Sequence, residues 1–270
     1  MKAISISFIW YWKEASKFEG NWRDGLRGAI ELISKKHHVA WYTDENVPED
    51  IYDFYLFWGD SNCPFFDKLD QYKGKKGICL STMPSNFDNL RKVDVVYCES
   101  QPVYDAVRAQ GIRAILAFGT DTDFYTPTET VKDIPYFYPA TFSPWKRQSA
   151  LSPLMSDLWC IGTLQPDGQG ELNAVANAGA HVEIGYFPPE KIREYYNRAV
   201  NVPIPAIHGS ERTCLEAMSM NILPEVNPQN VKTHSYIDEY KKSGYKTPRE
   251  FVLDNYSHVI YAERLLRGME

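Results

Sequence analysis

The sequence predicts an α/β protein built from parallel sheets with helices on both faces. Short apolar runs typical of buried strands alternate along the chain with segments of helical periodicity. Strands that alternate with helices favour parallel sheets, because the helix returns the chain to the edge where the next strand starts. The same alternation occurs in both halves of the 270 residues, which are enough for two small domains.

In the first half, strands are predicted over residues 3–10, 38–43, 53–58, 76–81, 93–98 and 113–118. The first run alternates small polar with large apolar side chains and lacks a small-residue cleavage site, so it indicates a strand rather than a signal peptide. Apolar residues at helical intervals from Trp22 to Ile33 predict a helix after it. A second helix is predicted over residues 101–110, where Gly111 ends it.

In the second half, strands are predicted over residues 134–140, 158–161, 181–184, 202–207 and 222–226, and helices over about 145–156, 169–178, 189–199, 210–220 and 233–243. Near the end, Thr247 is the expected cap of a helix, Pro248 its first residue and Glu250 its third, which predicts a capping box. One long amphipathic helix is predicted from there to the end of the chain.

Composition limits the class of protein. Hydrophobic residues make up 44% and charged residues 24% of the chain, as in soluble globular proteins. No apolar run reaches the roughly 18 residues of a membrane-spanning helix, and the five cysteines are scattered among apolar runs. This predicts a cytoplasmic protein with reduced cysteines and no metal-ligand spacing. The net charge of −6 argues against broad nucleic-acid binding.

Residues 208–218 form the most informative segment, because they follow an apolar run and open a predicted helix. Gly209 allows a tight turn, and Ser210 is a favourable N-cap. A strand, a turn and a helix N-terminus present backbone N–H groups and the positive end of a helix dipole, so residues 209–213 (Gly209, Ser210, Glu211, Arg212 and Thr213) are a predicted phosphate site. Glu216, two turns into the helix, could accept from both hydroxyls of a ribose. The alternative is an amphipathic helix with one exposed carboxylate.

This segment resembles the signature of the retaining, two-domain glycosyltransferases of family 4. In that family a Glu, seven residues and a second Glu precede a run such as Ala-Met-Ala. Residues 216–218 fit the second half, while His208 stands in place of the first Glu. The resemblance implies two Rossmann-like, doubly wound domains facing a cleft, an arrangement called GT-B.

The polar loop at residues 119–127 resembles the family's link between domains. It sets the predicted boundary: residues 1–120 would bind the acceptor, and residues 121–270 would bind the nucleotide sugar. The resemblance also implies that the C-terminal helix returns to the first domain. Asp121 and Asp123 have the spacing of a metal–nucleotide motif found in another glycosyltransferase fold. We interpret them as part of the linker, because a Phe and a Pro follow, and expect no metal.

The family also has an Arg, and then a Lys five residues on, that contact the diphosphate. Lys146 matches the Lys, Thr141 stands at the position of the Arg, and Arg147 is placed to supply the missing charge. A diphosphate leaving group requires such cations. The alternative is a pair of solvated basic residues. Because basic side chains are electrostatically unfavourable at a helix N-terminus, we expect an anion nearby.

Two further residues are candidates for the donor site, and each has a simpler alternative interpretation. His208 would approach the sugar of the donor, although it could equally cap the turn. Gly20, in the loop after the first strand, would let the sugar phosphate approach, as a glycine does in the family, but a single loop glycine is a weak signal.

The sequence therefore predicts a retaining glycosyltransferase that uses a nucleoside diphosphate sugar and needs no cofactor. No general base is evident, but retaining transfer can proceed by front-face attack, in which the leaving phosphate takes the acceptor's proton. The acceptor stays open among lipids, polysaccharides, proteins and modified nucleic-acid bases. The alternatives are a nucleotide-sugar epimerase or hydrolase on the same fold, and a binding protein without catalysis, suggested by Thr141 and His208.

Overall fold

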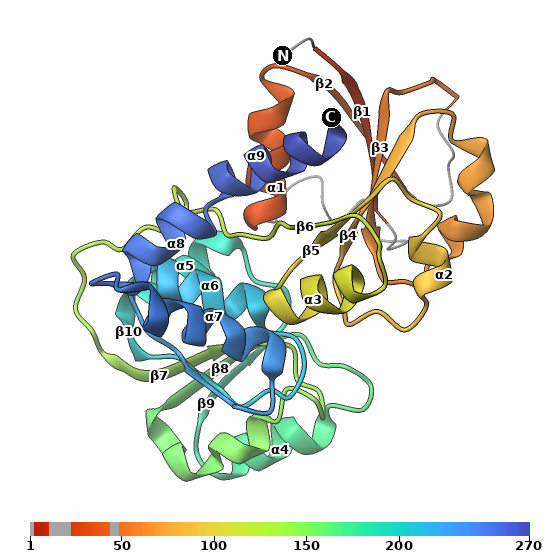
Figure 1. The fold of residues 1–270 in the computed structure, drawn as a ribbon. Coiled ribbons are helices and arrows are strands. Elements are labelled where there is room, and N and C mark those ends of the chain that lie inside the picture. Colours follow the sequence, from red (N-terminus) through yellow and green to blue (C-terminus); the bar gives the residue numbers. More distant parts are fainter. Residues whose placement is uncertain (1–2, 11–22, 44–48) are drawn as a thin grey trace. The chain divides into compact units, whose positions relative to one another are not determined.

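The computed structural model describes residues 3–10, 23–43 and 49–270 (Figure 1). The chain divides into two compact units. The first unit contains Met1–Gly119 together with Tyr256–Glu270, and the second contains Thr120–Asn255. The first unit is therefore made from two separate stretches of the chain.

The first unit is built on one parallel sheet, and each of its strands was predicted from an apolar run. The strands are β1 (Ser5–Trp10), β2 (His38–Thr43), β3 (Phe54–Gly59), β4 (Lys75–Leu80), β5 (Val95–Cys98) and β6 (Ala114–Leu116). Their order is β2-β1-β3-β4-β5-β6, and every neighbouring pair is parallel. The expected parallel sheet is confirmed.

Apolar side chains cover both faces of this sheet. Leu56 and Phe57 are consecutive in β3 and both fully buried, yet they belong to different hydrophobic clusters. Successive side chains of a strand point to opposite faces, so a strand buried on both sides reads as a continuous apolar run. This is why the central strands β3 and β5 were recognisable in the sequence.

Helices that pack on the sheet supply further side chains of both hydrophobic clusters. The predicted helices are α1 (Gly25–Ser34), whose N-cap Asp24 accepts from the Arg27 N–H, and α3 (Gln101–Ala109). The 3-10 helix η2 (Pro64–Gln71) and the short helix α2 (Phe87–Leu90) were not predicted. Both are too short for a clear helical period in the sequence.

The second unit contains a smaller parallel sheet, with strands β7 (Ile134–Pro139), β8 (Leu158–Gly162), β9 (His181–Ile184) and β10 (Ala199–Asn201) in the order β10-β7-β8-β9. A separate pair joins β11 (Pro203–Ile204) to β12 (Glu225–Val226). The predicted strand over residues 202–207 is wrong in extent. Pro203 and Pro205 have no N–H to donate to a sheet, so only β11 pairs there.

The helices of the second unit are α4 (Gln169–Asn177), α5 (Pro189–Arg198), α6 (Glu211–Ser219), α7 (Val231–Ser243) and α8 (Pro248–Asn255), all near predicted positions. The α-helix expected over residues 145–156 is wrong. A 3-10 helix, η3 (Gln148–Asp157), stands there, with Pro153 inside it and a non-helical Met155 at φ 51°. Proline removes a backbone donor and crowds the preceding turn, which prevents a continuous α-helix.

The single long helix predicted at the C-terminus is also wrong, because the chain forms α8 and then a separate helix, α9 (His258–Met269). Ser257 begins α9 by accepting from the Ile260 N–H at 3.3 Å. The capping box at the start of α8 is confirmed: Thr247 and Glu250 each accept from the other's backbone N–H at 3.2 Å. The break assigns α8 to the second unit and α9 to the first.

Helix α9 lies beside α1 although the two are at opposite ends of the sequence (Figure 1). Tyr261 and Leu265 of α9 are buried in the same cluster as Phe8 and Ile30. The C-terminal residues therefore complete the core of the first unit.

All five cysteines are buried and none forms a disulfide. Burial raises the pKa of the Cys79 and Cys160 thiols to about 12, as expected for core positions. Among the residues described here, no helix is both long and apolar enough to cross a membrane.

Candidate functional site

The turn before α6 has an unusual backbone. Gly209 and Ser210 both lie in the left-handed region, each at φ 70°. The positive φ favours glycine at position 209, and a Cβ atom there would be 2.8 Å from the Lys146 Nζ, so the ammonium group would have to move away. The tight turn predicted at Gly209 is confirmed.

Ser210 occupies the N-cap position of α6 but does not act as predicted, since its side chain makes no capping hydrogen bond. An N-cap residue normally has an extended backbone, which aims its side chain at the first turn. At φ 70° and ψ 14°, Ser210 instead accepts from Lys146 Nζ at 2.8 Å, and its Oγ lies 3.3 Å from the Tyr138 hydroxyl. The serine thus links the helix start to the loop after β7.

Lys146 reaches α6 because two loops are joined beside it. The Ile207 N–H donates to the Trp145 carbonyl at 3.0 Å, and the Lys146 N–H donates to the Ser143 carbonyl at 2.9 Å. These bonds fix the chain on either side of the ammonium group. The structure therefore brings together Lys146 and Gly209–Ser210, which the sequence analysis had singled out separately.

Two glycines let the loop after β8 pack against the segment that leads to Lys146. A Cβ on Gly162 would lie 2.2 Å from the Ala140 carbonyl oxygen, and one on Gly168 would lie 2.0 Å from that of Phe142. Thr141, at the position of the family's Arg, has its hydroxyl 2.9 Å from that of Thr163. In this structure Thr141 therefore joins the loop after β7 to the loop after β8.

Arg147 follows Lys146 but has no such contact with α6. It lies in the left-handed region at φ 55°, directly before η3, and is half-buried. Within residues 3–10, 23–43 and 49–270 we find no hydrogen bond or ion pair of its guanidinium group. Its assignment as a second cation stays a prediction.

Glu216 lies on α6 with its carboxylate almost buried, since the residue is 5% exposed. Its Oε2 accepts from the Tyr196 hydroxyl at 3.2 Å, and its Oε1 lies 3.7 Å from Arg212 Nε. Burial, together with the negative charge of Glu216, raises the pKa of Tyr196 well above its usual value, so the tyrosine stays a hydrogen-bond donor. Tyr196 and Arg212 together orient the carboxylate.

The remaining predicted residues that the structure describes take no part in the contact between Lys146 and Ser210. His208 is exposed, and the Thr213 hydroxyl donates to the Pro139 carbonyl at 3.3 Å. Glu211, the first residue of α6, is buried and forms an ion pair with Lys232 at 3.0 Å. Gly20 lies outside the described residues.

Lys232 was missed by the sequence analysis, although a signal for it existed. It is the second residue of α7, where a basic side chain is electrostatically unfavourable. The same argument had pointed to an anion beside Lys146. Applied to α7, it would have predicted the carboxylate that the structure places there.

Asp121 has a structural role in the described residues. It is 4% exposed and accepts from the Phe124 N–H at 3.0 Å, which closes a turn at the start of the second unit. In the described part of the chain no three His, Cys, Asp or Glu side chains gather as metal ligands would. Asp121 thus acts as a turn residue here, and the expectation that no metal binds stays a prediction.

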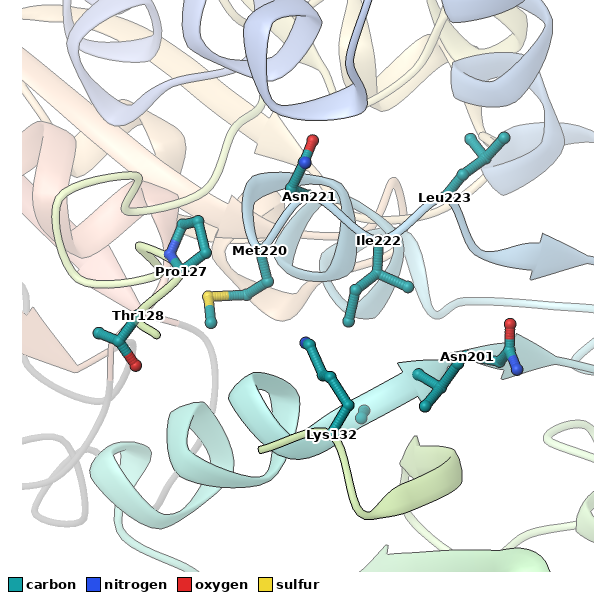
Figure 2. Close-up of a pocket in the computed structure, with 10 residues that line it drawn as sticks. Pro127, Thr128, Lys132, Asn201, Met220, Asn221, Ile222 and Leu223 are labelled. Carbon is teal, nitrogen blue, oxygen red and sulfur yellow. The ribbon is translucent and has the colours of Figure 1, made fainter. Parts of the chain in front are cut away.

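A separate pocket of about 440 Å³ lies at the amino ends of β7 and β10 (Figure 2). It is lined by Pro127, Thr128, Lys132, Ala199, Val200, Asn201, Met220, Asn221, Ile222 and Leu223. Lys132 points into it and is the charged member of this set (Figure 2). Among the residues that the structure describes, none of the predicted site residues lines this pocket.

Neither a protein-family model nor a curated protein sequence matches the chain. Solved structures do match in three dimensions. An α-glucosyltransferase in complex with UDP and a 13-mer DNA containing an HMU base matches with a TM-score of 0.61 and 10% identity, over 99% of both chains. AviGT4, a glycosyltransferase involved in avilamycin A biosynthesis, matches with a TM-score of 0.60 and 12% identity, over 98% of this chain and 97% of its own.

A putative UDP-N-acetylglucosamine 2-epimerase from Listeria monocytogenes also matches, with a TM-score of 0.54 and 12% identity, over 99% of this chain and 96% of its own. At such low identities the likeness shows the fold alone. The chain has the GT-B type of fold that these glycosyltransferases and epimerases share, with two Rossmann-like units, and the predicted fold class is confirmed.

Proposed function

We propose that this chain is a retaining glycosyltransferase and that its second unit binds the sugar donor, a nucleoside diphosphate sugar. The observation that carries the proposal is the position of Lys146, whose Nζ donates to Ser210 at the start of α6. An ammonium group and a helix N-terminus at one point form a suitable site for a diphosphate. The GT-B fold and the resemblance of residues 208–218 to family 4 support this assignment.

In the proposed reaction, the bond between the anomeric carbon and the diphosphate oxygen breaks, and an acceptor oxygen bonds to the same face of that carbon. The leaving phosphate takes the acceptor's proton, so no separate base is required. Lys146 would stabilise the charge that develops on the diphosphate, with Arg147 as a second cation. The proposed reaction uses no metal.

The other roles follow from position. The backbone N–H groups of residues 209–213 would hold the phosphates, and Glu216 would accept from the ribose hydroxyls. His208 would face the sugar. The first unit would bind the acceptor, with Gly20 near the sugar phosphate.

A nucleotide-sugar epimerase is the second candidate, favoured by the similarity to the Listeria monocytogenes structure. An epimerase needs no acceptor, since it inverts a carbon of the sugar. The two candidates therefore differ in their products.

The deciding experiment incubates the purified protein with UDP, GDP, ADP and dTDP sugars, and with pooled acceptors, in the presence and absence of EDTA. We expect release of nucleoside diphosphate that EDTA does not abolish, and a product with the donor's anomeric configuration by NMR. An epimerised sugar formed without acceptor would establish the second candidate. Tight binding without turnover would indicate a binding protein.

A further inference from the structure

A buried ion pair lies at the start of α6. Lys232 Nζ, in the first turn of α7, is 3.0 Å from Glu211 Oε1, and each side chain is 8% exposed. Buried ion pairs often contribute little net stability, because taking two charges out of water costs about as much as their attraction returns. The pair therefore calls for an explanation other than stability.

The turn at Gly209 lies close to both Lys146 and the ion pair. The position of a Cβ on Gly209 lies 2.8 Å from Lys146 Nζ and 3.9 Å from Glu211 Oε2. The Gly209 carbonyl accepts from Asn230 Nδ2 at 2.8 Å and from Thr233 Oγ1 at 2.9 Å. These two residues bracket the lysine of the pair, so the start of α7 is fixed to the start of α6.

Glu211 creates an electrostatic difficulty for the proposed function. A carboxylate suits a helix N-terminus, but this one lies where the diphosphate of the sugar donor is proposed to bind. Near a protein surface, a negative charge about 6 Å from a diphosphate weakens the binding of that diphosphate by about tenfold to a hundredfold, depending on screening by salt. An uncompensated Glu211 would therefore repel the diphosphate.

We propose that Lys232 is a positioning residue for the sugar donor: it neutralises Glu211, so that the charge beside Gly209 and Ser210 stays positive and accepts a diphosphate. Lys146 then contacts the phosphates directly, while Lys232 acts through Glu211. This inference rests on the proposed function.

A double-mutant cycle tests the inference by calorimetry with the tightest-binding of UDP, GDP, ADP and dTDP. Lys232→Met leaves Glu211 unpaired and should weaken binding about tenfold or more. Glu211→Gln should tighten binding by about threefold or more, because it leaves the positive charge of Lys232 uncompensated beside the diphosphate. The double variant should bind within about threefold of wild type. The parent nucleoside, which has no phosphate, should bind all four proteins equally.

A double variant as weak as Lys232→Met, or unchanged affinity in both single variants, would overturn the inference. If Lys232→Met does not fold, Glu211→Gln decides alone, and affinity at or below wild type overturns it. The matched control is Asp133→Asn, which removes the carboxylate of the exposed Asp133–Arg198 pair and should leave affinity unchanged. If wild type binds none of the four diphosphates, the proposed function fails. If it binds one and the cycle fails, only the role of Lys232 fails.

Discussion

At the scale of single residues, Lys146 is the strongest test of the proposed chemistry. A cation that stabilises the departing diphosphate acts more on the transition state than on the bound sugar donor. We therefore expect Lys146→Ala to lower kcat about a hundredfold while raising the donor's Kd less than about tenfold. Steady-state kinetics and calorimetry measure the two effects. The control is Lys241→Ala, an exposed lysine at the end of α7, which should change neither. A kcat near wild type would assign Lys146 to loop structure.

Glu216 is the second residue to test, through the isosteric Glu216→Gln. An amide is uncharged and has an NH2 donor in place of one oxygen, so it accepts from the two ribose hydroxyls less well than a carboxylate. We expect nucleoside diphosphate binding to weaken by about 1.5–3 kcal/mol, the scale of a charged hydrogen bond. The amide oxygen still accepts from the Tyr196 hydroxyl, so Tm should change little. Calorimetry with ribo- and 2′-deoxyribonucleotides is decisive, because the loss should be clearly smaller for the deoxy form, which keeps only the 3′-hydroxyl. Equal losses for both would exclude the ribose contact.

His208 is the position where the chain departs from the family it resembles, and its exposure leaves it accessible to a ligand. A neutral imidazole offers one donor and one acceptor, whereas a carboxylate accepts several hydrogen bonds. We expect His208→Glu to change discrimination among donor sugars by about 1–3 kcal/mol, with little change among bases. The ratios of kcat/KM for several sugars on one nucleotide measure this. Identical ratios in variant and wild type would leave His208 as a turn residue.

At the scale of elements, α8 is fastened to the end of α6 by one side chain. Arg249 Nη1 donates to the carbonyls of Tyr125 at 3.0 Å and Ser219 at 2.6 Å, and its Nη2 donates to the Thr122 carbonyl at 3.3 Å and the Thr126 hydroxyl at 3.2 Å. Burial lowers the pKa of the guanidinium group, which nevertheless stays charged at neutral pH. The residue thus joins three segments that are distant in sequence.

We expect Arg249→Met to lower the free energy of unfolding by about 2–4 kcal/mol, because it removes the charged hydrogen bonds that join three segments and takes the donor from the Ser219 carbonyl. Arg249→Lys should recover less than half of this loss, since an ammonium group cannot span the same acceptors as the planar guanidinium. Urea denaturation gives both values. Lys242→Met, in the exposed last turn of α7, is the control and should be nearly neutral. A neutral Arg249→Met would show that the network is dispensable.

At the scale of the whole molecule, the first unit depends on the last residues of the chain. The Tyr97 hydroxyl, from β5, donates to the Leu265 carbonyl of α9 at 2.8 Å. A Cβ on Gly268 would lie only 2.3 Å from that hydroxyl oxygen. Glycine is therefore required where α9 crosses the buried tyrosine.

We expect Gly268→Ala to destabilise the protein by about 1–3 kcal/mol, the usual cost of overpacking a core. The matched control is Gly170→Ala in α4, where a Cβ meets no atom within 4 Å and alanine favours the helix. Thermal unfolding of the two variants should separate them clearly. Equal Tm values would mean that α9 shifts freely on the first unit.

The elements with local causes were predictable from the sequence. Strands β1 to β5 and β7 to β9 were found close to their observed bounds, and those buried on both faces, such as β3 and β5, read as continuous apolar runs. The capping box of Thr247 and Glu250 and the turn at Gly209 also follow from neighbouring residues. The sequence likewise selected Lys146 and Gly209, which the fold brings to one place. It did not predict η2, because a short helix shows no period of its own.

Other features were decided only by tertiary structure, because they depend on partners far along the chain. The side chain of Ser210 does not cap α6 but accepts from Lys146, which is 64 positions away. The C-terminal helix broke in two because its halves pack in different units. The ion pair of Glu211 with Lys232 exists because Asn230 and Thr233 fix α7 to the Gly209 carbonyl. Periodicity and capping record contacts within a few residues, whereas the charge around a ligand site is set by side chains that only folding brings together.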